Sequence, residues 1–150
     1  MSMNVRRAGV DDLDALAVLF DAYRQFYAQP SDVPGAQAFL EARLVNDESV
    51  IFIAEVPEGA AGFTQLYPLF TSVGMQRLWL LNDLYVAAGQ RRTGAATALM
   101  EAAHAHAIET GASGVMLETQ KTNAAAQALY RRLGYRRNDV TDFWFLALPQ

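Results

Sequence analysis

The residues with the clearest chemical potential form a tight basic turn, Arg91-Arg92-Thr93-Gly94-Ala95-Ala96, between the apolar segment Leu84-Tyr85-Val86 and an alanine-rich stretch. If that stretch is a helix, its first backbone N–H groups have no internal partner and lie at the positive end of its dipole, which favours an anion. Gly94, Ala95 and Ala96 have little side chain to keep a phosphate away from the backbone. The turn therefore predicts a phosphate site, with a pyrophosphate as the best ligand.

Two common nucleotide-binding motifs are excluded. Gly89 and Gly94 have the glycine spacing of a P-loop, but Ala95 and Ala96 occupy the positions where that motif needs Lys and Ser or Thr. The Gly-x-Gly-x-x-Gly pattern of dinucleotide-binding folds is absent as well. The turn instead fits the pattern Arg/Gln-x-x-Gly-x-Gly/Ala.

A second motif follows about 30 residues later along the chain. It reads Asn-x-x-Ala-x-x-Leu-Tyr-x-x-x-Gly-Tyr, and its members are Asn123, Ala126, Leu129, Tyr130, Gly134 and Tyr135. Together with the first pattern, it resembles the GNAT superfamily of acetyl-CoA-dependent N-acetyltransferases. The resemblance covers the whole order of expected elements, and its specific signal lies in residues 82–135.

This resemblance implies acetyl-CoA as the co-substrate. Its pyrophosphate would bind the turn formed by Arg91, Arg92, Thr93, Gly94, Ala95 and Ala96. Its peptide-like arm would lie along the backbone of Leu84, Tyr85 and Val86, as an added strand does. The resemblance also implies a bulge that separates the strand 76–86 from the strand 115–119.

The resemblance assigns further roles to Asn123 and Tyr130. These residues are seven positions apart, so they share one face of a helix. Tyr130 is expected to protonate the departing CoA thiolate, although it could instead be a packed aromatic residue. Asn123 is expected to touch the cofactor, to cap the helix, or to do both.

The acetyl acceptor is expected to be an amine that the site must deprotonate. A primary amine with a pKa near ~10.4 is protonated at pH 7. Converting it to the neutral, nucleophilic form at that pH costs roughly 4–5 kcal/mol. Asp83 is the first candidate to hold and deprotonate it, and Glu118 is the second. The string from Asn82 to Val86 resembles the Glu-Asp-aromatic string of diamine and thialysine acetyltransferases, except that Asn82 replaces an acidic residue. Further candidates to face the acceptor are Tyr23, Tyr27, Gln65, Tyr67 and Trp79.

The elements that must position these residues follow from hydrophobic patterning and from turn residues. Apolar residues at helical spacing begin after Asp11 and Asp12, and Pro30 to Gly35 separate this helix from the next. The expected elements are strands at 3–8, 50–56, 61–67, 76–86, 115–119 and 143–148, and helices from about 13, 36–46, 92–110 and 124–133. An antiparallel meander followed by βαβ units predicts an α+β (mixed α/β) fold: a largely antiparallel twisted sheet with one parallel pair and helices on both faces.

Composition narrows the class of protein further. A length of 150 residues predicts a single domain, residues 1–150, and a net charge of −4 disfavours nucleic-acid binding. The absence of cysteine excludes a thiolate nucleophile and a thiolate zinc site, and His104 and His106 are too close in sequence to share a helix face. We therefore expect no metal. No apolar run is long enough to span a membrane and residues 1–7 lack a signal-peptide pattern, so we expect a cytoplasmic protein.

The sequence therefore predicts an N-acetyltransferase in which a small-molecule amine, such as a polyamine, a lysine analogue or an amino acid, attacks acetyl-CoA directly. A protein lysine or N-terminus is the alternative acceptor. A non-catalytic module that senses acetyl-CoA is the alternative function. The apolar run at residues 143–148 is either a core strand or part of an interface in an expected homodimer.

Overall fold

The structure is a computed structural model that describes residues 3–150. The chain forms two compact units, one ending at Glu118 and the other spanning Thr119–Gln150. None of the helices formed by residues 3–150 has the length and apolarity that crossing a bilayer requires.

The first unit is built around one five-stranded sheet with the strands in sequence order. Its strands are β1 (Asn4–Arg7), β2 (Val50–Val56), β3 (Gly59–Thr71), β4 (Gln76–Val86) and β5 (Gly114–Met116). Its helices are α1 (Leu13–Phe26), α2 (Val33–Val45) and α3 (Ala95–Glu109), with short 3-10 turns η1 (Val10–Asp12) and η2 (Ala88–Gln90). The first four strands pair antiparallel and β4 pairs parallel with β5, which confirms the predicted fold class.

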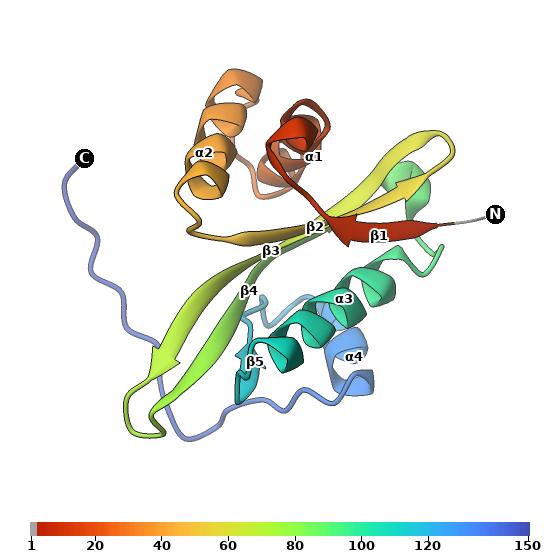
Figure 1. The fold of residues 1–150 in the computed structure, drawn as a ribbon. Helices are drawn as coiled ribbons and strands as arrows, with labels where there is room; N and C mark the ends of the chain where they lie inside the picture. The colour runs from red at the N-terminus through yellow and green to blue at the C-terminus, as the bar shows by residue number, and fades with distance from the viewer. Residues whose placement is uncertain (1–2) are drawn as a thin grey trace. The chain divides into compact units, whose positions relative to one another are not determined.

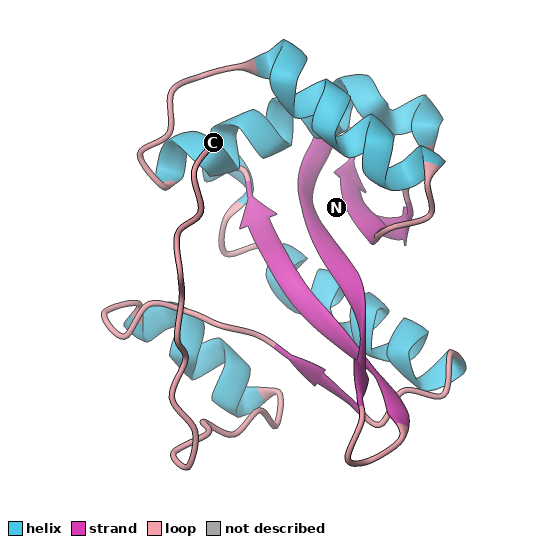
Figure 2. Cartoon of the chain, turned by 90° about the vertical axis from the view of Figure 1, so that its left-hand side faces the viewer, coloured by secondary structure: helices cyan, strands magenta, loops and turns pink. Residues whose placement is uncertain are grey.

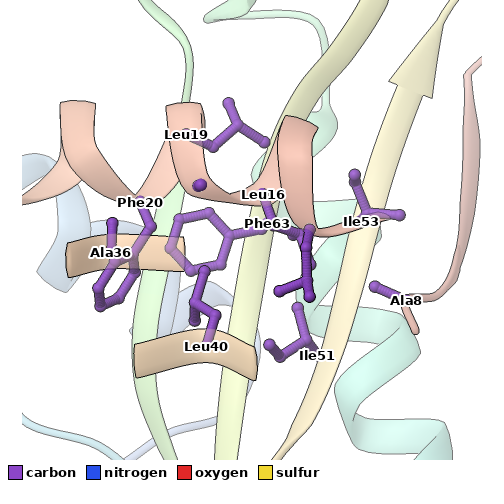
Figure 3. Close-up of a cluster of buried hydrophobic side chains, with 11 residues drawn as sticks. Ala8, Leu16, Leu19, Phe20, Ala36, Leu40, Ile51, Ile53 and Phe63 are labelled. Atoms are coloured by element: carbon purple, nitrogen blue, oxygen red, sulfur yellow. The ribbon is translucent and has the colours of Figure 1, made fainter. Parts of the chain in front are cut away.

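Helices cover both faces of this sheet, with α1 and α2 on one side and α3 on the other (Figure 1, Figure 2). The alternation of side chains along β2 explains this arrangement. Ile51 and Ile53 pack against α1 and α2, in a cluster that includes Leu16, Leu40 and other side chains (Figure 3). The intervening residues of β2 belong to a second cluster with Leu99 of α3.

Two of the boundaries that differ from the expectation involve proline. The strand β3 was expected to stop before Pro68, but it continues to Thr71. The pairing with β2 ends at Leu66, so β3 has a neighbour on one side only at Pro68, where the missing N–H is tolerated. The helix α2 starts at Val33, three residues earlier than expected, because Asp32 caps it and Pro34 stands in its first turn.

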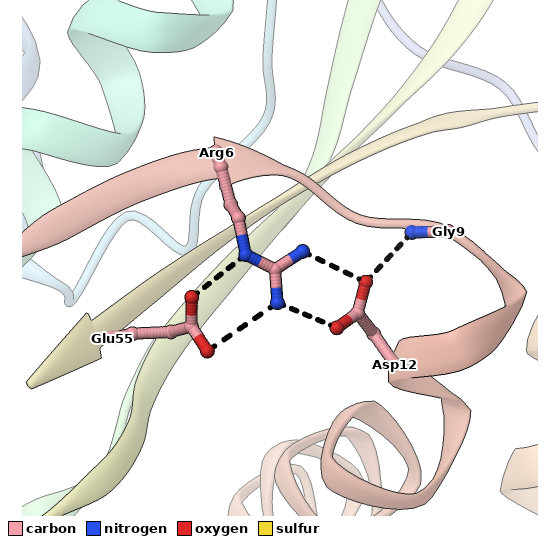
Figure 4. A network of polar contacts seen from close by, with 4 residues as sticks. All are labelled: Arg6, Gly9, Asp12 and Glu55. Carbon is pink, nitrogen blue, oxygen red and sulfur yellow. Dashed lines mark hydrogen bonds and ion pairs between the residues drawn. The ribbon is translucent and has the colours of Figure 1, made fainter.

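A bidentate guanidinium connects the start of α1 with the sheet. Arg6 on β1 donates to Asp12 at 2.7 and 3.0 Å, and to Glu55 on β2 at 2.8 and 3.3 Å (Figure 4). Asp12 also accepts from the backbone N–H of Gly9 at 2.8 Å. The hydrogen bonds from Arg6 lower the pKa of Asp12, so its carboxylate stays charged and holds the turn before α1.

The second unit contains α4 (Ala124–Arg132) and a C-terminal segment without regular secondary structure (Figure 2). The expected strand at residues 143–148 is therefore wrong for this structure. A strand exists only where its N–H and C=O groups meet a neighbour, and no strand pairs with this segment within residues 3–150. Its large apolar side chains are exposed instead: Phe143, Trp144, Phe145, Leu146 and Leu148.

Candidate active site

The basic turn predicted to bind an anion does lead directly into the first turn of α3. Gly94 stands at the helix N-cap with φ +84°, and Arg92 also has a positive φ of 64°. Neither a side-chain cap nor an acidic residue occupies the first turn of α3 within the described chain. The first N–H groups of this helix are thus left for an external acceptor, at the positive end of a helix of 15 residues.

Two side chains fix the shape of this turn. Arg91 donates from Nε to the backbone oxygen of Val86 at 3.2 Å, and its guanidinium lies 5.9 Å from the ring centre of Tyr85. Thr93 donates from its hydroxyl to the backbone oxygen of Gln90 at 2.6 Å. Arg92 is exposed. Arg91 and Thr93 therefore hold the turn against the end of β4, while the charge of Arg92 faces solvent.

The strand β4 carries the predicted bulge. Gln65 pairs with Asp83 and Leu66 pairs with Leu81, so Asn82 is an extra residue on β4. The parallel pairing with β5 ends at Leu80. Within residues 3–150, no strand pairs with the β5-side edge of β4 from Leu81 to Val86, which leaves this edge able to accept a peptide-like ligand.

Asp83 lies in a buried row of polar side chains that crosses three strands. Gln65 on β3 donates from Nε2 to Oδ2 of Asp83 at 2.6 Å, and Ser49, just before β2, donates to Oε1 of Gln65 at 2.8 Å. Asn82 donates to Oδ1 of Asp83 at 3.1 Å. Ser49, Gln65 and Asp83 are each at most 4% exposed. The sheet thus fixes the carboxyl group of Asp83 from two sides.

The electrostatic setting of Asp83 is unusual for a carboxylate. Burial raises the pKa of Asp83, and hydrogen bonds from Gln65, Tyr23 and Asn82 oppose this rise. None of the ion pairs formed by residues 3–150 includes Asp83. Burial also raises the pKa of the neighbouring Tyr67 to about 12, with a further contribution from the charge of Asp83. A buried carboxylate without a counter-charge favours a cation as its partner.

Tyr23 on α1 lies beside this carboxyl group, among other aromatic rings. The ring of Tyr23 is 5.8 Å from that of Phe63, 6.1 Å from that of Tyr85 and 5.2 Å from that of Tyr27. Trp79, another aromatic residue expected to face the acceptor, is instead part of the α3 side of the core. Its indole N–H donates to Thr110 at 2.8 Å and its ring lies 5.0 Å from that of His106.

Glu118 is not on a strand as expected. The strand β5 ends at Met116, and Glu118 lies two residues further on, exposed and in a segment without regular structure. Its backbone has no ladder to hold it, because the pairing with β4 is limited to three residues of β5. Among the two candidate carboxylates, only Asp83 is held in a defined orientation.

In the second unit, Asn123 and Tyr130 both lie on α4 or at its start. Asn123 is the N-cap residue, and its side-chain oxygen accepts from the backbone N–H of Ala126 at 3.1 Å. The rings of Tyr130 and Tyr135 are 5.9 Å apart, and the backbone N–H of Tyr135 donates to the oxygen of Tyr130 at 2.9 Å. The helix-capping role of Asn123 is confirmed. The roles of Asn123 at the cofactor and of Tyr130 as an acid stay predictions.

The structure adds one site residue that sequence reasoning did not identify. Ser49 precedes β2 and touches Gln65 only because the strand register brings them together, so no local pattern indicates it. Gln65 carried a weak signal, since it is a polar residue within an apolar strand. In the described part of the chain, no group of three or more histidine, cysteine, aspartate or glutamate residues is arranged to hold a metal.

Comparisons with known proteins agree with this fold. The profile of the Acetyltransferase (GNAT) family matches residues 16–135. An uncharacterized N-acetyltransferase, YhfO, of Bacillus subtilis (strain 168) is 48% identical over 147 residues, covering 98% of this chain and 99% of the relative. A crystal structure of a probable acetyltransferase superposes with a TM-score of 0.92 at 38% identity, covering 98% of this chain and 99% of the other.

A more distant structure, a ribosomal-protein-alanine N-acetyltransferase from Brucella melitensis biovar Abortus 2308, has a TM-score of 0.79 at 20% identity, over 97% of this chain and 100% of the other. This similarity concerns the fold alone. The fold and its closer relatives define an acetyltransferase enzyme. The chain belongs to the GNAT family, whose members typically use acetyl-CoA.

Proposed function

We propose that this enzyme transfers an acetyl group from acetyl-CoA to the primary amine of a small molecule, by direct attack within a ternary complex. The observation that carries the proposal is the buried carboxyl group of Asp83, which is held beside the bulge of β4 and forms no ion pair within residues 3–150. An ammonium group is the partner that such a carboxylate lacks. No protein nucleophile is required, which agrees with a chain that contains no cysteine.

The residues around α3 fit the phosphate portion of the co-substrate. The N-terminus of α3 has no side-chain cap and offers N–H groups and positive charge to a pyrophosphate. The residues of this turn are Arg91, Arg92, Thr93 and Gly94 before the helix, and Ala95 and Ala96 at its start. The unpaired edge of β4 at Leu84, Tyr85 and Val86 offers backbone groups to the pantetheine arm. The bound thioester supplies an activated acetyl group, and the backbone at Tyr85 and Val86 orients it and polarises its carbonyl.

Asp83 would hold the ammonium and accept its proton. Deprotonating an amine of pKa ~10.4 at pH 7 costs roughly 4–5 kcal/mol, so a base at the site is required. Burial raises the pKa of Asp83 and makes it a stronger base than an exposed carboxylate. Glu118 is the second candidate for this role, and its exposed position favours Asp83.

Tyr130 would protonate the departing thiolate, and Asn123 would contact the cofactor as well as capping α4. A phenol can donate a proton to a thiolate if the product is stabilised or quickly reprotonated. This assignment depends on the motif shared with similar acetyltransferases. It also distinguishes an enzyme from a module that only senses acetyl-CoA, because a sensor does not need the acid.

The acceptor is proposed to be a polyamine, a lysine analogue or an amino acid, with a protein lysine or N-terminus as the alternative. The sequence around Asp83 resembles the diamine and thialysine acetyltransferases, but the neutral Asn82 stands where they have an acidic residue. Asn82 is the extra residue of the bulge and is exposed. A single carboxylate therefore favours amines with one positive charge near the reacting nitrogen.

Three broader features complete the proposal. We propose that residues 1–150 form one functional acetyltransferase domain, because the family profile spans both compact units. The exposed apolar run at 143–148 supports a homodimer, in which a second copy would cover it. The need of the enzyme for acetyl-CoA supports a cytoplasmic location. The net charge of −4 of the chain supports neither nucleic-acid nor membrane partners.

The proposal is tested by measuring thiol release from acetyl-CoA with a panel of acceptors. The panel contains monoamines, diamines, lysine analogues, amino acids, and peptides with a free lysine or N-terminus. We expect release with small amines in excess of the rate with peptides. Bound CoA without thiol release would establish the sensor alternative, and release with peptides alone would establish the protein acceptor.

A further inference from the structure

We propose that Gln65, supported by Ser49, is the positioning residue for Asp83: it donates to the carboxylate while Asp83 is ionised and accepts from the carboxylic acid once Asp83 has taken a proton. This inference depends on the proposed role of Asp83. It deepens that role by explaining how a buried carboxyl group can change its protonation state during turnover without losing its hydrogen bonds.

The hydrogen bonds that link Ser49, Gln65 and Asp83 support the first part of the proposal, that Gln65 donates to the ionised carboxylate. The Nε2 atom of Gln65 lies 2.6 Å from Oδ2 of Asp83, which suits an ionised carboxylate that can only accept. The Oε1 atom of the same amide accepts from Ser49 at 2.8 Å. Both ends of the amide are therefore used in this orientation.

The chemistry of an amide and a hydroxyl supports the second part, that Gln65 accepts from Asp83 once Asp83 is protonated. When Asp83 takes a proton from an ammonium, one N–H bond breaks, its electron pair stays on nitrogen, and one O–H bond forms on the carboxyl group. A half-turn of the Gln65 amide then presents Oε1 to this new donor and Nε2 to Ser49. The hydroxyl of Ser49 can accept as well as donate, so it suits both orientations. The amide ends have nearly the same shape, so buried packing is preserved.

Other groups also face the carboxyl group of Asp83. Tyr23 on α1 and Asn82 on β4 oppose the rise in the pKa of Asp83 by hydrogen bonding to its ionised form. Tyr67 on β3 has a pKa raised to about 12, so it stays neutral, and Arg43 on α2 acts electrostatically on Tyr67. Gln65 is the group beside Asp83 whose far end is backed by a hydroxyl that can reverse its role.

The test compares the titration of Asp83 in the full-length protein and in three variants. Gln65→Met keeps the length of the side chain and removes the hydrogen bonds to both Asp83 and Ser49. Ser49→Ala removes only the hydrogen bond from Ser49 to Gln65. Thr64→Val is the matched control, because the equally buried Thr64 hydroxyl donates at 2.7 Å to the backbone oxygen of Asp83 and not to its carboxyl group. The readouts are the carboxyl ¹³C chemical shift of Asp83 against pH, and the acid limb of kcat/KM.

We expect Gln65→Met to move the midpoint of Asp83 upward by about one pH unit, because the hydrogen bond to the ionised carboxylate that it removes is stronger than the one to the carboxylic acid. Ser49→Ala is expected to move the midpoint in the same direction by less. Thr64→Val is expected to leave the midpoint unchanged even if it lowers Tm. The side-chain amide resonances of Gln65 should titrate with the midpoint of Asp83. If Gln65→Met folds poorly, Ser49→Ala provides the same comparison.

Unchanged midpoints in both Gln65→Met and Ser49→Ala would overturn the inference. The failure of the proposed function gives a different result. In that case Asp83→Asn would keep the rate and the acid limb of the wild type, whatever the NMR titration shows. The NMR readout does not require turnover, so the two outcomes are distinguished even with an inactive protein.

Discussion

Replacing Gly94 by alanine should strain the start of α3 and thereby lower either the stability of the protein or its affinity for CoA. Gly94 has φ +84°, a conformation that costs an L-residue about 1–2 kcal/mol. A Cβ at this position meets nothing within 4 Å, so no steric clash adds to this cost. The effect of Gly94→Ala therefore isolates the backbone conformation of the anion-binding turn.

Gly89→Ala is the matched control in the same connection between β4 and α3. A Cβ at Gly89 also meets nothing within 4 Å, and its φ lies outside the positive region. Both substitutions restrict the unfolded chain to the same extent, so their difference reports the native strain of Gly94. That difference should be about 1–2 kcal/mol, which corresponds to a factor of about 5 to 30 in an equilibrium constant.

The strain can appear in either of two measurements. If the turn keeps its shape, Gly94→Ala lowers the free energy of unfolding relative to Gly89→Ala, as measured in urea. If the turn rearranges instead, stability is retained and the Kd for CoA, measured by calorimetry, rises by the corresponding factor. Equal unfolding free energies together with equal Kd values for the two variants would refute the reasoning.

Three further predictions concern other parts of the molecule. Tyr130→Phe should lower kcat while the Kd for CoA is retained, and an unchanged kcat would contradict its role as the acid. Gly62→Ala should destabilise the protein by roughly 1–3 kcal/mol, because its Cβ would lie 2.5 Å from the backbone oxygen of Tyr85. Gly114→Ala, whose Cβ meets only a side chain at 3.6 Å, should be tolerated in the same denaturation experiment. Burial lowers the pKa of His106 below 6.5, so the unfolded chain binds more protons than the folded one below that pH, and the free energy of unfolding should fall on acidification. His106→Phe should reduce the dependence of the unfolding free energy on pH. An unchanged pH dependence would contradict the effect of burial on His106.

The sequence predicted the parts of the fold that have strong local patterns. The strands β2 and β4 have the predicted bounds, and α3 and α4 lie within a few residues of theirs. The basic turn before α3 was predictable because its chemistry is local to a helix start. The element at 143–148 was wrong, because a strand needs a partner and that partner is not encoded in the run itself.

The acceptor side of the site was predictable only in part. Asp83 was identified from its place on an apolar strand, but its orientation depends on the bulge at Asn82 and on the register of β3. Ser49 reaches Gln65 across β2 and β3, over 16 residues of sequence. Such contacts follow from the pairing of distant strands, which local propensity does not determine.

The most direct measurement of the central claim follows the acetyl group itself. The wild-type protein is incubated with acetyl-CoA carrying a deuterated acetyl group and with a small primary amine, and both amine and protein are analysed by mass spectrometry. We predict that the label appears on the amine, in step with free CoA, and that Asp83→Asn slows this transfer. Label found on the protein, or bound CoA with no labelled amine, would contradict the account.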